Sequence, residues 1–145
     1  MFEKFGEMSS CREINELAEN LLNEGDIQSL KVMAQENGIP EDYVELYRSS
    51  DIPYLCDAVT AAMGKLDVEC GSLKLAGLMN DWVEYIRGLC MEDEMVAHQV
   101  RKKGKSLKQC IAEILKYAFK NQVPVDEEII KAAGVNARKV TFGDP

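Results

Sequence analysis

The sequence has few of the residues on which enzyme active sites and metal centres are usually built. Its 145 residues include a single histidine, His98, and five cysteines that never form a Cys-x-x-Cys pair. One histidine inside a helical pattern supports neither a nucleophile–histidine pair nor a zinc site, and is typical of a surface position. Glycine-rich phosphate-binding loops are missing too. We therefore expect a protein that is not an enzyme and that holds no metal ion or cofactor.

Long apolar segments and paired cysteines are also missing. No apolar run approaches the roughly 18 residues that cross a bilayer. Residues 1–7 lack the basic and apolar parts of a signal peptide. The cysteines are odd in number and widely spaced, which is typical of a reducing compartment. They are Cys11, Cys56, Cys70, Cys90 and Cys110. These features predict a cytoplasmic protein that does not enter membranes.

Helical periodicity dominates the sequence from about residue 10 to residue 134. Apolar residues recur at helical spacing between capping and breaking residues such as Ser10, Gly25 and Gly134. The pattern predicts an all-α fold, in which residues 1–145 form a single compact domain of about seven or eight short helices. The pattern breaks between about residues 67 and 72, and we predict a loop at Cys70-Gly71-Ser72.

Two apolar stripes are the best candidates for the core. One runs over residues 75–90 and the other over residues 107–119. The side chains that we predict to be buried are Trp82, Ile86, Cys90, Cys110, Leu115 and Phe119.

The charges are divided unevenly along the chain. Residues 1–100 carry 20 acidic and 7 basic side chains, whereas residues 101–145 carry 5 acidic and 10 basic ones. Such polarity suggests that charge is used for recognition, because a strongly acidic surface can compete for a basic groove on a nucleic-acid-binding protein. A solvated surface on which charges happen to segregate is the alternative. The candidate acidic contacts are Glu41, Asp42, Glu45, Asp81, Glu84, Glu92, Asp93 and Glu94.

The basic C-terminal part supports a second hypothesis, direct binding of nucleic acid. Its candidate contacts are Arg101, Lys102, Lys103, Lys105, Arg138 and Lys139. Residues 126–142 partly match the helix-turn-helix pattern of bacterial repressors, in Ile129, Ala133–Gly134–Val135 and Val140. The bulky Ile130 and the later Gly143 and Pro145 depart from that pattern. We interpret the segment as an ordinary helix that Gly134 caps, with DNA reading as the alternative.

Residues 103–118, followed by residues 125–129, resemble the PcfK-like family. The shared features are a Lys-Ser helix cap at 105–106, Cys110 in an amphipathic helix, and an Asp-Glu-Glu-Ile start to the next helix at 126–129. The family belongs to conjugative and phage-derived elements of gut bacteria and includes inhibitors of Cas9. The resemblance covers about 35 residues, and the chain departs from the family pattern after Ile129.

Three hypotheses follow. The first, which the resemblance implies, is an anti-CRISPR protein of a mobile element that binds Cas9, or another protein with a basic groove, through its acidic surface. The second is a DNA-binding accessory protein of a conjugative element that uses residues 101–142. The third is a scaffold for a partner helix.

Overall fold

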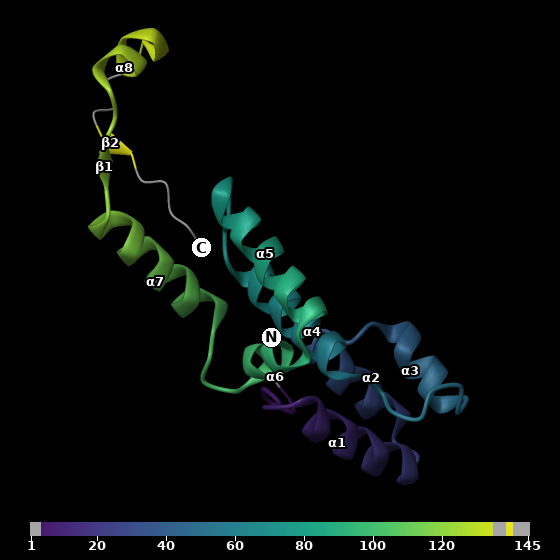
Figure 1. Ribbon diagram of the computed structural model, residues 1–145. Coiled ribbons are helices and arrows are strands. Elements are labelled where there is room, and N and C mark those ends of the chain that lie inside the picture. The colour runs from purple at the N-terminus through teal and green to yellow at the C-terminus, as the bar shows by residue number, and fades with distance from the viewer. Residues whose placement is uncertain (1–3, 135–138, 141–145) are drawn as a thin grey trace. The chain divides into compact units, whose positions relative to one another are not determined.

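The computed structural model describes residues 4–134 and 139–140. The predicted all-α class is confirmed, with eight helices in the described part of the chain (Figure 1). They are α1 (Cys11–Asn23), α2 (Ile27–Glu36), α3 (Glu41–Arg48), α4 (Ala58–Ser72), α5 (Leu78–Glu92), α6 (Glu94–Arg101), α7 (Leu107–Lys120) and α8 (Glu127–Ala133). Two strands of two residues each, β1 (Val123–Pro124) and β2 (Lys139–Val140), pair in antiparallel fashion. The chain divides into two compact units, residues 1–107 and 108–145.

Short polar side chains start most of the helices. The residue before the helix accepts a hydrogen bond from a backbone N–H of the first turn, which satisfies a donor that the helix itself leaves without a partner. This is seen for Ser10, Asp26, Asp57, Asp93 and Asp126. At the other end of α8, Gly134 takes the left-handed conformation (φ 66°), as the sequence predicts.

The loop predicted at Cys70-Gly71-Ser72 is wrong, because α4 continues to Ser72. Two interactions stabilise this last turn. The Glu69 carboxylate accepts a hydrogen bond of 2.9 Å from the Leu107 backbone N–H, and the Ser72 hydroxyl donates one of 2.9 Å to the Glu69 carbonyl. Gly71 lowers helix propensity by about 1 kcal/mol relative to Ala. The tertiary contact of Glu69 offsets that cost, and the local sequence does not reveal it.

The core of the first unit consists of two adjoining clusters. One gathers buried residues of α1, α2 and α4, including Ile14, Leu30 and Met33, together with Leu55. The other joins α4, α5 and α6 through small residues such as Ala62, Cys90 and Ala97. The predicted burial of Trp82 and Cys90 is confirmed, while Ile86 is half-buried.

Two glycines set the distance between α4 and the turn after α2. Gly38 has a positive φ of 73°, and a Cβ atom on it would collide with the backbone of Gly64 in α4. A Cβ atom on Gly64 would meet the backbone of Asn37 and Gly38 in the same way. Because neither collision involves a flexible side chain, both positions require glycine for the two backbones to touch.

Two buried cations bind the first unit together. The Arg101 guanidinium donates to the carbonyls of Met8 (3.0 Å), Ala61 (3.0 Å) and Asn37 (3.3 Å), and to Asn37 Oδ1. The Lys65 ammonium donates to the carbonyls of Lys102 (2.7 Å) and Lys105 (2.5 Å) and pairs with Glu7 at 2.8 Å. Both side chains are about 1% exposed. They connect the segment before α1, the turn after α2, α4 and the loop after α6.

The second unit contains most of α7, the strand pair and α8. In α7 the predicted burial of Leu115, Phe119 and Cys110 is wrong: Leu115 is 48% exposed, Phe119 is 78% exposed, and Cys110 is exposed. Periodicity correctly predicts an amphipathic helix, but it does not show whether another element covers the apolar face. In the described part of this 38-residue unit, α8 is the one further helix, and it is too short to cover the apolar face of α7.

None of the described helices combines the length and the apolar character that a membrane crossing requires.

Candidate functional site

The acidic residues of α3 are partly neutralised by their own neighbours. Lys31 Nζ lies 3.1 Å from Glu41 Oε1 and 3.3 Å from Glu45 Oε1, and Arg48 Nη1 lies 3.2 Å from Glu45 Oε2. The hydrogen bond from Lys31 lowers the pKa of Glu45, and the bond to Glu41 raises the pKa of Lys31. Asp42 is exposed and forms no ion pair within the described part of the chain. In this group, Asp42 is the carboxylate without a nearby cation.

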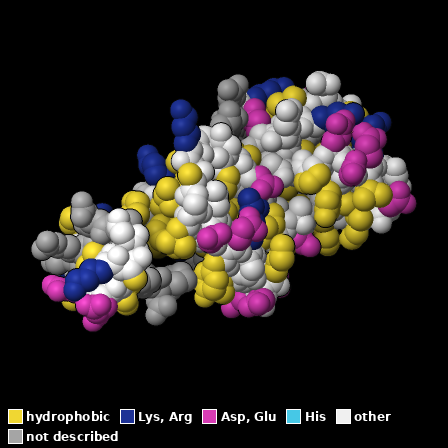
Figure 2. Space-filling model, turned by 90° about the horizontal axis from the view of Figure 1, so that it is seen from above, with side chains coloured by type: hydrophobic (Ala, Val, Ile, Leu, Met, Phe, Trp, Pro, Cys, Tyr) yellow, Lys and Arg dark blue, Asp and Glu magenta, His cyan; other side chains and the backbone are white. Residues whose placement is uncertain are grey.

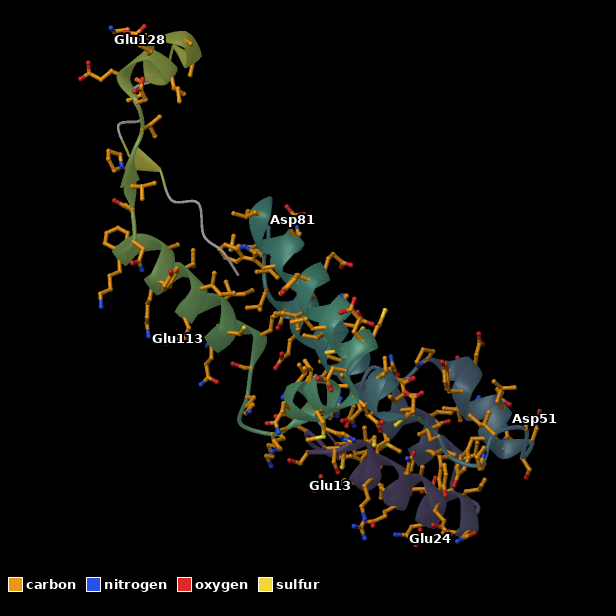
Figure 3. All side chains as sticks on the ribbon, in the orientation of Figure 1. Glu13, Glu24, Asp51, Asp81, Glu113 and Glu128 are labelled. Atoms are coloured by element: carbon orange, nitrogen blue, oxygen red, sulfur yellow. The ribbon has the colours of Figure 1, made fainter. Side chains whose placement is uncertain are left out.

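Of the two candidate acidic residues in α5, Glu84 is paired with a cation and Asp81 is not. Glu84 lies 3.3 Å from Arg87, and Arg87 also pairs with Asp67 of α4 at 2.7 Å. Asp81 is exposed in the first turn of α5, where the helix dipole favours a negative charge. No cation of residues 4–134 lies within ion-pair distance of Asp81. Figure 3 shows Asp81 near the N-terminal end of α5.

The three acidic residues between α5 and α6 have three different surroundings. Asp93 caps α6, since its Oδ1 accepts a hydrogen bond of 2.8 Å from the Met95 N–H. Glu94 lies 3.5 Å from His98 Nε2. Glu92 is exposed at the end of α5 and has no ion-pair partner among the described residues. Asp93 therefore has a structural role, and Glu92 is the residue of this group most available to a partner.

The acidic groups do not converge on one site. Figure 3 shows Asp81 near one end of the first unit and Asp51 and Glu24 near the other. On the face seen in Figure 2, the acidic side chains form several separate groups between hydrophobic and uncharged side chains. The first unit thus presents dispersed carboxylates, which suits an extended basic surface better than a small cationic ligand.

The surface of the first unit is more acidic than its amino-acid composition indicates, because two of its basic side chains are buried. Residues 4–107 contain 19 acidic and 11 basic side chains. The two basic side chains described above, Lys65 and Arg101, are buried, whereas every one of the 19 carboxylates is at least partly exposed. The solvent-facing surface therefore carries 19 carboxylates against nine cations. Nothing in the periodicity of the sequence predicts this difference, although Lys65 stands out among small and apolar neighbours.

The structure removes Arg101 from the candidate nucleic-acid contacts. Its donors are used by carbonyl and amide oxygens of the protein, and burial lowers its pKa. Lys102, Lys103 and Lys105 are exposed in the loop after α6, and Lys105 Nζ donates to Gln99 Oε1 at 2.8 Å. Arg138 lies outside the described residues, and of Lys139 only the backbone is described, in β2.

The described residues do not support the helix-turn-helix alternative for residues 126–142. A recognition helix would have to include Val140. Instead Val140 pairs with Val123 in the antiparallel strands, and Lys139 pairs with Pro124. The strand β1 therefore precedes α8 in the sequence, and its partner β2 follows α8. The interpretation of α8 as an ordinary helix capped by Gly134 is confirmed.

The cysteines and acidic side chains are the candidate ligands for a metal ion, and the thiols are also the candidate nucleophiles. No group of three or more His, Cys, Asp or Glu side chains among the described residues could hold a metal ion. All five cysteines are free thiols. Burial raises the pKa of each, and that of Cys56 rises to about 12, which disfavours the nucleophilic thiolate.

Comparison of the chain with protein-family models, curated proteins and solved structures found no match.

Proposed function

We propose that this chain is a non-enzymatic interaction protein that binds a basic, nucleic-acid-binding groove of a partner protein through its acidic first unit. The observation that carries the proposal is the surface charge of residues 4–107, with 19 exposed or half-exposed carboxylates against nine cations. A surface of this kind accelerates association with a basic partner by electrostatic steering. The resemblance to the PcfK-like family makes Cas9 the proposed partner and a mobile element the proposed origin.

The carboxylates without an internal cation should contribute most to binding. Asp42, Asp81 and Glu92 are exposed and form no ion pair with a described residue. A partner cation can approach them without first displacing Lys31 or Arg87. Glu41, Glu45 and Glu84 must exchange an existing ion pair for a new one, so their net contribution is smaller. Asp93 is best left unchanged in any test, because its substitution would remove the cap of α6.

The test measures binding of the full chain to a Cas9–guide complex, with and without target DNA, at several salt concentrations. Screening should weaken the interaction steeply between roughly 50 and 200 mM salt. A triple variant, Asp42→Lys, Asp81→Lys and Glu92→Lys, should slow association about tenfold or more while leaving the far-ultraviolet circular dichroism unchanged. The matched control is Glu113→Lys, Glu127→Lys and Glu128→Lys, which changes the net charge equally but lies in the second unit.

Opposite results would support direct binding of nucleic acid. In that case Lys102→Glu, Lys103→Glu and Lys105→Glu would abolish binding of free duplex DNA. The triple substitution of Asp42, Asp81 and Glu92 would change that binding little. Under our proposal the lysine variants have little effect. Tight binding of duplex DNA at physiological salt, together with no binding of the Cas9–guide complex, would contradict the proposal.

A further inference from the structure

A groove of about 480 Å³ lies between α1 and the connection from α3 to α4. Along α1 it is lined by polar and charged side chains, among them Asn15, Glu16 and Glu19. The other wall is formed by Tyr47, at the end of α3, and by Pro53 and Tyr54 of the connection. The groove therefore combines two tyrosines and a proline with carboxylates, and all the residues that line it belong to the first unit.

The two walls of the groove are held in a fixed relation. The Asn15 side chain donates to the Cys56 carbonyl at 2.9 Å and accepts from the Cys56 N–H at 3.0 Å. Leu55 is fully buried in the core beside this pair of hydrogen bonds. Tyr54 precedes Leu55 directly and is 66% exposed. Covering an exposed aromatic ring removes apolar surface from water, which is favourable. Because the backbone next to Tyr54 is already held in place, binding of a ligand to the ring would cost little conformational entropy.

Carboxylates lie near the groove and contribute to raised pKa values of two groups that line it. At one end, burial and then the negative charge of Glu19 raise the pKa of Tyr47. At the other end, burial and then the charges of Asp57 and Glu94 raise the pKa of Cys11. Among the described residues that line the groove, the one cation is Arg12, and it is paired with Glu16 at 2.9 Å. Glu19 forms no ion pair with any described residue.

We propose that this groove binds an arginine side chain of a protein partner. A flat guanidinium stacks on a tyrosine ring and pairs with a carboxylate at the same time, whereas a lysine ammonium provides only a point charge. Tyr54 would supply the ring and Glu19 the carboxylate, and Pro53 would give an apolar wall for the aliphatic stem. The groove uses none of the candidate acidic contacts of α3, α5 and α6, so this inference goes beyond the proposed function.

The test measures fluorescence anisotropy of a labelled peptide of three Arg-Gly-Ser repeats added to the full chain. Two matched peptides contain lysine or uncharged citrulline in place of arginine. We expect the arginine peptide to bind more tightly than the lysine peptide, and the citrulline peptide not to bind. Tyr54→Ala should weaken binding about fivefold, the effect of one cation–π contact. Glu19→Gln should weaken it about twofold to fivefold. Arg12→Ala should strengthen it, because the substitution frees Glu16.

Matched substitutions outside the groove separate this site from general attraction to an acidic protein. Tyr85→Ala removes another exposed tyrosine, and Glu24→Gln removes another carboxylate of the α1 region, and neither should change the affinity. Bound peptide should also protect Cys11 from alkylation, while Cys110, which does not line the groove, keeps its rate.

The inference is overturned if Tyr54→Ala binds like the wild type, or if the lysine peptide binds as tightly as the arginine peptide. Unchanged alkylation of Cys11 at saturating peptide would also overturn it. No Cas9 is present in this assay, and Asp42, Asp81 and Glu92 are unchanged in all variants. The groove and the proposed function can therefore fail independently.

Discussion

Replacement of the buried Arg101 by methionine should destabilise the first unit strongly. The change keeps a side chain of similar length and removes the guanidinium, with its four hydrogen bonds to Met8, Asn37 and Ala61. A hydrogen bond from a charged donor contributes about 2 kcal/mol, so the four together contribute about 8 kcal/mol. Removal of the buried charge recovers its desolvation cost, which is several kcal/mol, here taken as about 4. The expected net loss is about 4 kcal/mol.

Most of this loss should arise at Asn37. Asn37 is fully buried, and both its backbone carbonyl and its side-chain Oδ1 accept hydrogen bonds from Arg101. The Ala61 carbonyl belongs to a helix and Met8 is only half-buried, so these two groups can find other partners more easily. Arg101→Lys should recover part of the stability, because an ammonium reaches fewer of these acceptors at once.

The assay is equilibrium unfolding in urea, followed by circular dichroism and by the fluorescence of the single tryptophan, Trp82. The control is Lys103→Met, which removes an exposed charge from the adjacent loop and should change stability by no more than about 0.5 kcal/mol. A loss below about 1 kcal/mol for Arg101→Met, at unchanged denaturant slope, would refute the argument. It would mean that the guanidinium hydrogen bonds only balance the cost of its burial.

Two further predictions concern the core and the thiols. Leu30→Ala should lower the free energy of unfolding by about 2–5 kcal/mol, because Leu30 is fully buried. Leu115→Ala should lower it by less than about 1 kcal/mol, because Leu115 is 48% exposed. Equal losses in urea melts would contradict the exposure of the apolar face of α7. Burial raises the pKa of Cys56 from an ordinary 9.0 to about 12, so the thiolate fraction at pH 8 falls about a thousandfold. We therefore expect iodoacetamide to alkylate Cys56 at pH 8 about a thousandfold more slowly in the folded protein than in urea. Mass spectrometry of the labelled peptides measures both rates, and a ratio near one would contradict the burial of this thiol.

The sequence predicts the acidic surface of the first unit only in part. The charge imbalance of residues 1–100 is visible in the sequence, and so are the groups on α3, α5 and α6. Which carboxylates are already paired depends on residues distant in sequence. Lys31 reaches Glu41 and Glu45 from α2, and Arg87 of α5 reaches Asp67 of α4. No periodicity argument predicts such pairs, because they depend on how the helices pack.

The groove beside α1 was not predicted at all. Its residues are spread over positions 11–54, and each of them is unremarkable in its local sequence. The sequence predicts that the next helix begins near Pro53 and includes Leu55, whereas α4 begins at Ala58 and residues 51–55 form a connection. A weak signal existed in Pro53-Tyr54, because an aromatic residue in a polar connection is often exposed for binding. Without the Asn15–Cys56 hydrogen bonds there was no reason to place it against α1.

The sequence by itself determines the helices of this protein and most of their ends. Helix caps such as Ser10, Asp26 and Gly134 act within one turn, so the information lies within a few residues of the helix end. Tertiary structure decides the rest. It buries Arg101 and Lys65 by giving each of them several backbone carbonyls as acceptors, and it leaves Leu115 and Phe119 exposed on a helix that looks like a core helix. The physical reason is the same in both cases: amphipathic spacing shows which face of a helix is apolar, while burial depends on what other segments bring to that face.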